Sequence, residues 1–365
     1  MADTTPYWVA SADLPEFPAL TTEIKVDVLV IGAGITGVTA AYLLKKAGRK
    51  VALIEAARLV TRDTAHTTAH VTCVTDTRLR ELTETFGKEH ARAAWEAGWA
   101  AIEQIQANAR DERIDCEFVR VPAYLHAPNR NVSKAEIDAL REDATIASEL
   151  GFDAVFMDQV PLMNAPGVRF ANQAKFHPRK YLAGLAQRIP GEGSYLFEKT
   201  EAHEFRSRPF RVIANGCPIH CDYVVIGTHN PLQGRQNVVG ATLLQSKLAL
   251  YSTYAVGARI AKGSAPEASF WDTGDPYNYL RIDAREDGDY AILGGSDHKT
   301  GQESDTEQSY AALEQQMRAL FPGAELTHRW SGQVIETPDG LPYIGEIARR
   351  QFIATGFAGN GMTFG

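Results

Sequence analysis

The clearest hydrophobic pattern lies between residues 26 and 55, where two apolar runs flank a glycine-rich turn and a helix-forming segment. Residues 26–31 are almost entirely apolar, which is typical of a strand that a parallel sheet buries on both faces. The segment after the turn carries small residues where a helix meets a sheet, and it ends at Gly48, a common C-terminal stop. Residues 51–54 are apolar again. The pattern therefore predicts a strand, a turn, a helix and a second strand.

The pattern changes after residue 55. Residues 56–76 are dense in threonine and histidine and show no periodicity, so we expect a loop close to a ligand. Apolar positions at helical spacing predict helices over residues 87–113, 133–150, 179–189 and 306–321. The second of these helices begins with a capping box made by Ser133 and Glu136.

Strand patterns dominate two other regions. Residues 195–226 predict strands with a tight hairpin turn at Asn215 and Gly216. Residues 241–300 alternate between strand and turn, which predicts an antiparallel sheet rather than a continuation of the parallel one. Residues 1–25 are rich in proline, threonine and acid and predict an extended arm over the surface. Parallel and antiparallel elements thus alternate along the chain, so its domains are expected to be discontinuous.

The glycine-rich turn has the spacing of a dinucleotide-binding motif. Gly32 allows a tight turn, Gly34 lets backbone amides approach a pyrophosphate, and Gly37 lets the helix sit close to the strand. Glu55 ends the second strand, where a carboxylate accepts hydrogen bonds from an adenosine ribose and repels a 2′-phosphate. FAD or NAD is therefore favoured over NADP. The cofactor-binding residues proposed from this motif are Gly32, Ala33, Gly34, Ile35, Thr36, Gly37 and Glu55.

The composition limits the classes of function. The chain has 365 residues, 44 per cent of them hydrophobic, and a formal net charge of −8. This length suggests about two domains. The absence of a lysine and arginine stripe argues against a nucleic-acid partner and against an anionic membrane surface. The longest apolar stretches are interrupted by glycine or charge, so no membrane span is expected.

The N-terminus and the cysteines indicate the compartment. The first residues lack the basic region and apolar core of a secretory signal. The cysteines show no disulfide-framework spacing, so we expect a reducing cytoplasm. The sequence CPIHC at residues 217–221 has no second ligand pair elsewhere, which favours a structural turn and strand over a metal site.

Four segments together resemble the D-amino-acid oxidase and glycine oxidase family of FAD-dependent oxidoreductases, and the resemblance covers nearly the whole chain. The segments are VIGAGITG with Glu55, DYVVIGTHNP, HRWSGQVIETPDGLPYIGEI and ATGFAGNGMTFG. HTTAHVT, GGSDHKTGQ and RWSGQ are similar to a bacterial subgroup whose members often carry a Rieske iron–sulfur domain after the flavin part. A Rieske centre needs two Cys-and-His pairs. This chain offers only CPIH, so no such centre is expected in it.

The resemblance implies an α/β fold with a Rossmann-like FAD-binding domain and a discontinuous antiparallel α+β substrate domain. We expect residues 26–115, 170–235 and 325–365 in the FAD-binding domain, and residues 116–169 and 236–324 in the substrate domain. In the family, GNGMT opens a helix whose amides face the flavin, whereas this sequence stops at Gly365. We therefore expect the natural protein to continue, or this chain to be only an ordered portion of it.

The resemblance also implies further cofactor-binding residues. Thr67, Thr68 and Ala69 are similar to a loop that passes over the flavin and pyrophosphate. His66 either bonds covalently to the flavin C8 methyl group, as in related dehydrogenases of N-methylated glycines, or makes an unmodified polar contact. Backbone of the strand region and of the C-terminal segment is expected near the cofactor, the latter close to flavin N1 and the C2 carbonyl. These residues are Ala202, Gly227, Thr228, Gly359, Asn360, Gly361, Met362 and Thr363.

Candidates for the substrate pocket come from the antiparallel region. Arg281 can hold a substrate carboxylate through paired donors, although an arginine in an exposed strand is also commonly solvated. His298 and Lys299, with Asp297, form a polar cluster that either positions substrate or oxygen or is a solvated turn. Tyr279, Trp271 and Trp330 either form a wall of the pocket or are ordinary core aromatics of the sheet, and Lys247 is a candidate cation near the flavin.

The leading hypothesis is an FAD-dependent oxidoreductase that oxidises a C–N bond of a small amine or amino acid to an imine. Its electrons pass to oxygen or, in an alternative, to a separate iron–sulfur or other acceptor protein. A dehydrogenase that uses NAD without flavin is disfavoured by the dispersed nucleotide segments and the C-terminal glycines. A flavoprotein that modifies RNA is disfavoured by the acidic charge.

Overall fold

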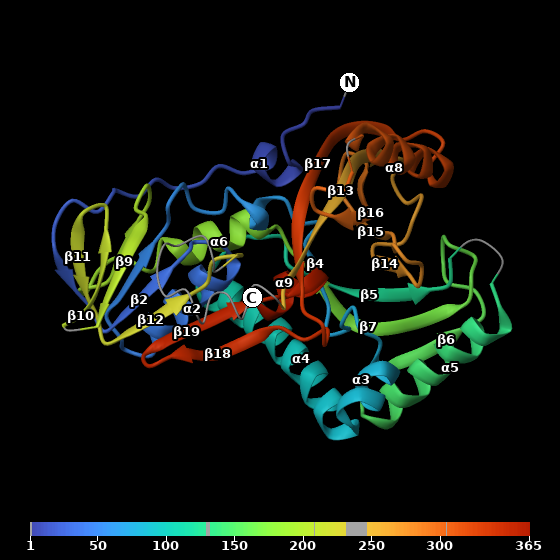
Figure 1. The fold of residues 1–365 in the computed structure, drawn as a ribbon. Helices are drawn as coiled ribbons and strands as arrows, with labels where there is room; N and C mark the ends of the chain where they lie inside the picture. The colour runs from blue at the N-terminus through green and yellow to red at the C-terminus, as the bar shows by residue number, and fades with distance from the viewer. Residues whose placement is uncertain (1, 129–131, 208, 231–246, 304) are drawn as a thin grey trace.

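The structure, a computed structural model, describes residues 2–128, 132–207, 209–230, 247–303 and 305–365. Within these residues the strands form a six-stranded, a nine-stranded and a four-stranded sheet. Figure 1 shows the six-stranded and nine-stranded sheets side by side, with the C-terminus between them. This arrangement confirms the predicted α/β fold with a second, largely antiparallel unit.

The six-stranded sheet contains the predicted strand, helix and strand unit. Its strand order is β18-β19-β12-β2-β3-β8, and the last five strands are parallel. The strands are β2 (Val28–Ile31), β3 (Val51–Ile54), β8 (Tyr195–Phe197), β12 (Tyr223–Ile226), β18 (Tyr343–Ala348) and β19 (Gln351–Thr355). Helix α2 (Ile35–Lys46) follows β2. Because β2 and β12 are parallel neighbours, the glycines that follow them lie at the same edge of the sheet.

The nine-stranded sheet is mostly antiparallel, as predicted for residues 241–300, of which 241–246 lie outside the described residues. Its order is β17-β13-β16-β15-β14-β5-β7-β4, with β6 paired to β7. The strands are β4 (His70–Val71), β5 (Val119–His126), β6 (Ala154–Met157), β7 (Gly167–Lys175), β13 (Ala249–Ile260), β14 (Ser269–Asp272), β15 (Tyr279–Asp283), β16 (Asp289–Lys299) and β17 (Glu325–Glu336). The predicted domain boundary at residue 325 places β17 and β13 in different domains. In the structure β17 is hydrogen-bonded to β13 along its length. That boundary therefore falls inside the sheet.

The predicted helices are present. They are α4 (Lys88–Asp111), α5 (Lys134–Glu149), α6 (Pro178–Ala186) and α8 (Thr306–Leu320), with α3 (Leu79–Phe86) just before α4. The Ser133 side chain accepts a hydrogen bond from the Glu136 amide at 3.1 Å, as a capping box requires. The Glu136 carboxylate instead accepts a hydrogen bond from Arg78 at 2.9 Å.

The four-stranded sheet has the order β1-β11-β10-β9 and confirms the predicted hairpin. Its strands are β1 (Ile24–Lys25), β9 (Ala202–Ser207), β10 (Phe210–Ala214) and β11 (Cys217–His220). Asn215 and Gly216 join β10 to β11 with φ angles of +47° and +79°. Positive φ at both positions is what a tight hairpin turn needs.

The N-terminal arm differs in part from the prediction. Residues Tyr7–Ser11 form a short helix, α1, and the Trp8 side chain is completely buried. Tyr7 stacks on Tyr290 of β16, with ring centroids 4.3 Å apart. Tyr7 and Trp8 thus belong to the hydrophobic core, and a five-residue helix is too short for its periodicity to show in the sequence. Residues 12–19 form no helix or strand and stay exposed or half-buried, which agrees with the predicted extended arm.

Candidate cofactor and active site

A cavity of about 1110 Å³ lies between the six-stranded and nine-stranded sheets. Its walls come from the ends of β2 and β12, the loop after β3, the strands of the nine-stranded sheet and the C-terminal segment. Small-molecule pockets usually measure about 300–1,000 Å³. This cavity therefore has room for an extended dinucleotide together with a small substrate.

The glycine turn between β2 and α2 forms one end of the cavity. Gly32 has a φ of +97°, which residues with a side chain rarely adopt. A Cβ atom on Gly37 would lie only 1.7 Å from the carbonyl oxygen of Gly32, and one on Gly32 would lie 3.1 Å from that of Gly227. The first turn of α2 is therefore pressed against the ends of two strands, with bare backbone facing the cavity. This is the arrangement of a pyrophosphate-binding turn.

Glu55 braces this turn from the end of β3. It is nearly buried, and its Oε2 accepts a hydrogen bond from the Ala33 amide at 2.8 Å while Oε1 accepts one from the Ala57 amide at 2.9 Å. The carboxylate thus links the glycine turn to the loop after β3. A ribose hydroxyl can still use the remaining lone pairs, since an ionised carboxylate has about four acceptor positions.

Replacing Glu55 with alanine is expected to weaken FAD binding by roughly ten- to a hundredfold, because its charge-assisted hydrogen bonds to the Ala33 amide of the turn and to the Ala57 amide of the following loop are lost. Fluorescence titration of the apoprotein with FAD measures this change. Glu149, which is exposed and paired with Lys88, provides the control. An unchanged dissociation constant in Glu55→Ala would contradict this role, and Glu149→Ala is expected to bind FAD normally.

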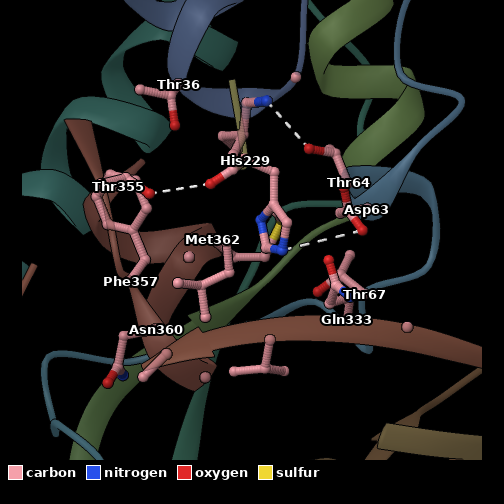
Figure 2. A pocket seen from close by; sticks show the side chains of 18 of the residues that line it. Thr36, Asp63, Thr64, Thr67, His229, Gln333, Thr355, Phe357, Asn360 and Met362 are labelled. Atoms are coloured by element: carbon pink, nitrogen blue, oxygen red, sulfur yellow. Dashed lines mark hydrogen bonds and ion pairs between the residues drawn. The ribbon is translucent and has the colours of Figure 1, made fainter. Parts of the chain in front are cut away.

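The loop after β3 is fixed over the cavity by hydrogen bonds to its backbone. The hydroxyl of Thr64 accepts a hydrogen bond from the Ile35 amide at the start of α2, at 3.2 Å (Figure 2). Three side chains from distant parts of the chain donate to nearby loop carbonyls. They are Trp330 to His66 at 2.8 Å, Trp8 to Thr67 at 2.6 Å, and Arg281 to Ala69 at 2.8 Å. The predicted loop is therefore rigidly positioned.

His229 is a cavity residue that the sequence analysis missed, although it follows the predicted strand end at Gly227 and Thr228 directly. Its carbonyl oxygen accepts a hydrogen bond from the Thr355 hydroxyl at 2.9 Å. Burial lowers the pKa of its imidazole, and the Asp63 carboxylate, 4.0 Å from Nε2, only partly offsets this. The ring is therefore neutral at pH 7. Figure 2 shows it turned toward Asp63 with Met362 close by.

The C-terminal segment is tied to the loop that precedes α3. This segment contains a 3-10 turn (Ala358–Asn360) and the short helix α9 (Gly361–Phe364). The Asp76 carboxylate accepts a hydrogen bond from the Gly359 amide at 2.6 Å, and the Asn360 side chain accepts one from the Asp76 amide at 3.1 Å. Thr363 accepts another from the Thr72 amide at 3.1 Å. Asp76, which the sequence analysis did not select, thus fixes the predicted flavin-facing segment.

Most of the predicted cofactor-binding residues share this cavity. Those that line it are Gly32, Ala33, Gly34, Ile35, Thr36, Glu55, His66, Thr67, Thr68, Ala202, Gly227, Thr228, Gly359, Asn360, Gly361 and Met362. Gly37, Ala69 and Thr363 lie behind the lining. Gly37 packs on Gly32, and the backbone of Ala69 and the side chain of Thr363 make the hydrogen bonds described above.

Arg281 does not lie where the substrate hypothesis needs it. Its side chain is 2 per cent exposed and is not part of the cavity lining. Nε donates to Asp283 at 2.8 Å, and Nη1 donates to the carbonyls of Ala69 and Phe176 at 2.8 and 3.0 Å. The guanidinium is neither solvated nor free for a substrate carboxylate, so both sequence interpretations of Arg281 are corrected.

Asp283, the partner of Arg281, is also bonded by the ammonium of Lys175 at 2.7 Å. Burial alone would raise the pKa of this carboxyl, but Arg281 and Lys175 outweigh burial and hold the pKa well below its usual range. An ionised Asp283 therefore stabilises the fold above its unfolded pKa of about 3.9, and this contribution is lost as the pH falls toward the folded pKa.

We expect the difference in free energy of unfolding between the wild type and Asp283→Asn to depend on pH. Unfolding by urea should show Asp283→Asn to be much less stable than the wild type at about pH 7, with a smaller difference at about pH 3. A difference in free energy of unfolding that stays constant across this range would contradict the depressed pKa.

His298 and Lys299 also lie outside the cavity lining. The His298 Nε2 atom is 2.9 Å from the Tyr254 hydroxyl, and Lys299 is exposed at the end of β16. The direct substrate role predicted for both is therefore corrected. Asp297, the neighbour on the opposite face of the strand, does line the cavity. Alternation of side chains along a strand accounts for the position of His298, whereas Lys299 lies outside the lining because it is exposed at the end of β16.

The nine-stranded sheet supplies an aromatic and acidic wall. Its residues include Trp271, Tyr277, Tyr279, Asp297 and Glu336. The Tyr279 hydroxyl lies 2.5 Å from the Thr253 hydroxyl. Burial raises the pKa of Asp297 to about 6. Trp330, another predicted pocket residue, is instead buried behind the lining and holds the loop.

Comparison with known proteins identifies the family. A family model described as FAD dependent oxidoreductase, DAO, matches residues 27–365. The chain belongs to the DAO family of FAD-dependent oxidoreductases. The predicted family resemblance is thus confirmed, and the cofactor of the family is FAD. The alternative of an NAD-dependent dehydrogenase without flavin is therefore set aside. No helix among the described residues has the length and apolar character needed to cross a membrane.

Individual DAO relatives cover nearly the whole chain. The putative Rieske 2Fe-2S iron-sulfur protein YhfW of Bacillus subtilis (strain 168) is 32% identical over 98% of this chain and 70% of its own length. Gamma-glutamylputrescine oxidoreductase of Escherichia coli (strain K12) is 20% identical over 99% of this chain and 86% of its own. Glycine oxidase from Geobacillus kaustophilus has a similar fold, with a TM-score of 0.75, 19% identity, and coverage of 93% of this chain and 91% of that chain.

The residues of this DAO chain fit FAD. A side chain at Gly37 would collide with neighbouring backbone, and one at Gly32 would need a strained positive φ, so the turn stays open for a pyrophosphate. The cavity then continues from this turn past the loop and the C-terminal segment to the aromatic wall. FAD, when bound, accepts a hydride equivalent from a substrate carbon.

Proposed function

We propose that this protein oxidises a C–N bond of a small amine or amino acid to an imine, which water then hydrolyses. The observation that carries the proposal is the continuous cavity, which joins a pyrophosphate turn to a wall of aromatic and acidic side chains. The names of two relatives, glycine oxidase and gamma-glutamylputrescine oxidoreductase, support the substrate class. The chain's part in this chemistry is to orient the substrate and to limit its access to water, since amine oxidation needs chiefly a well-placed C–H bond.

The proposed cofactor contacts divide along the cavity. Amides of the glycine turn hold the pyrophosphate, and Glu55 faces the adenosine ribose. Amides of Gly361 and Met362, which line the cavity, face the part of the flavin that becomes negative on reduction, and Thr363 supports them from behind the lining. The hydrogen bonds of Asp76 and Thr363 support this contact, because they fix the backbone of that segment.

His66 has two proposed roles. Its Nδ1 atom lies 2.9 Å from the Arg62 carbonyl oxygen, so a proton on Nδ1 leaves the Nε2 lone pair for a polar contact or for a covalent bond to the flavin. Acid precipitation of the holoprotein separates the two roles. Flavin in the supernatant rules out the covalent bond and leaves the polar contact, whereas flavin that stays in the pellet of the wild type but not of His66→Ala establishes the bond.

A panel of amines, N-methyl amino acids, D-amino acids and glycine tests the proposed function. Each compound is added to the oxidised holoprotein without oxygen, and bleaching of the flavin spectrum reports reduction whatever the natural acceptor is. We expect at least one compound of the panel to bleach the flavin. Failure of every compound would contradict the proposed reaction.

A second candidate is a dehydrogenase that passes its electrons to an iron–sulfur or other protein rather than to oxygen. The similarity to YhfW, a putative Rieske protein that extends beyond the matched region, favours it. Stopped-flow mixing of the reduced protein with air distinguishes the candidates. Rapid reoxidation indicates an oxidase, and slow reoxidation indicates a dehydrogenase.

A further inference from the structure

Three carboxylates gather at the substrate end of the cavity. Asp76 comes from the loop before α3, Asp297 from β16 and Glu336 from the end of β17. Burial raises the pKa of each carboxyl, and Asp76 raises those of Asp297 and Glu336 further by repulsion between like charges. All three residues line the same cavity, and their carboxylates create a negative potential in it.

One of these carboxylates has an oxygen atom that no hydrogen-bond donor among the described residues reaches. The Oδ1 atom of Asp297 is shielded from solvent and makes no hydrogen bond within the described residues. A buried oxygen of this kind costs free energy until a donor reaches it. Next to it, Tyr277 and Tyr279 lie with ring centroids 5.5 Å apart, and aromatic faces attract cations. Acid and aromatic rings together match an ammonium group.

Each described arginine of the cavity lining is either paired with a carboxylate or lies at the phosphate end of the cavity. Arg58 pairs with Glu198 at 3.4 Å, and Arg78 pairs with Glu136 at 2.9 Å. Arg62 is exposed and immediately precedes the Asp63–Ala65 turn, whose Thr64 contacts the start of α2, so it belongs to the phosphate end. A substrate carboxylate would thus meet three carboxylates at this end, with no free arginine among the described residues to bind it.

We propose that the substrate is an aliphatic diamine or longer polyamine, whose second ammonium group binds to Asp297 and Glu336 while the first amine is oxidised. The inference rests on the proposed function and names its substrate class. In the reaction the C–H and N–H bonds break and a C=N bond forms, so that a hydride equivalent (two electrons and one proton) passes to FAD and the second proton passes to water. Water then cleaves the imine to an aldehyde and ammonia.

Three four-carbon amines test the charge of the distal group in the oxidised holoprotein without oxygen. They are 1,4-diaminobutane, butylamine and 4-aminobutanoate, which end in an ammonium, a methyl and a carboxylate group. We expect the diamine to bleach the flavin at the lowest concentration, roughly ten- to a hundredfold below butylamine, and 4-aminobutanoate to be the poorest. Equal or better bleaching by 4-aminobutanoate or glycine overturns the inference and leaves the proposed function standing.

Binding measured without turnover separates this inference from the reaction itself. The holoprotein is reduced with dithionite, so it cannot oxidise an amine, and is titrated with 1,4-diaminobutane in a calorimeter. Asp297→Asn and Glu336→Gln are each expected to weaken diamine binding about tenfold or more and butylamine binding less than about twofold. Glu325→Gln, an exposed position at the other end of β17, is the matched control and should bind the diamine normally. Diamine affinity that is unchanged in both cavity variants, or reduced equally in the control, overturns the inference.

Discussion

Substitution of Gly37 by alanine is expected to abolish stoichiometric FAD binding and to lower the free energy of unfolding by about 3 kcal/mol or more. The added methyl group would lie 1.7 Å from the Gly32 carbonyl oxygen, and both groups belong to backbone that cannot rotate away. Helix α2 would have to move off the sheet, which separates its first amides from the pyrophosphate. Denaturant unfolding of the apoprotein and FAD titration measure the two effects.

Gly323 provides the matched control for this substitution. A Cβ at this position meets nothing within 4 Å, and its φ lies outside the left-handed region. Gly323→Ala is therefore expected to unfold and to bind FAD like the wild type. A Gly37→Ala protein that retains FAD and stability would show that α2 does not need its close approach to β2.

Substitution of Arg281 by methionine is expected to lower the free energy of unfolding by about 3–5 kcal/mol. The guanidinium is buried, donates to Asp283 and two carbonyls, and packs over the Trp8 ring at 4.9 Å. Without it, Asp283 keeps Lys175 and the more distant Arg285 as partners but loses the guanidinium that pairs with it at 2.8 Å. The Ala69 carbonyl also loses its donor, so the loop over the cavity loosens and FAD affinity falls.

Two further variants separate the causes of this effect. Arg281→Met combined with Asp283→Asn removes the uncompensated charge and should recover part of the lost stability. Arg169→Met breaks an exposed pair with Asp153 and should cost less than about 1 kcal/mol. If Arg281→Met and Arg169→Met lower the free energy of unfolding by similar amounts, the buried network around Arg281 contributes no more than an exposed ion pair, which contradicts this prediction. If Arg281 variants that stay folded bind amines as the wild type does, Arg281 is not part of the substrate pocket.

The sequence predicted the nucleotide-binding half of the fold because its signals are local. Gly32, Gly37 and Glu55 lie within one strand, helix and strand unit, and their spacing alone requires a close backbone approach. The hairpin at Asn215 and Gly216 is equally local, because its turn residues adopt the required positive φ. Such features depend on neighbours a few residues away.

The substrate end was less predictable because its contacts join distant segments. Arg281 is buried by Trp8, whose own burial depends on packing of the N-terminal arm. Asp76 meets Gly359 across most of the chain length. In the GGSDHK segment, the sequence did not establish which of Asp297 and His298 faces the cavity, since a change of one position reverses the face of a strand.

The amount of flavin in the purified protein tests the central claim most directly. That claim is that FAD lies in the cavity between the two sheets, with its pyrophosphate on the glycine turn of β2 and α2. We predict an oxidised-flavin spectrum with about one FAD per chain, retained on gel filtration by the wild type and Gly323→Ala but not by Gly37→Ala. A colourless protein that takes up no FAD when it is supplied, or a Gly37→Ala protein with the same flavin content, would contradict the account.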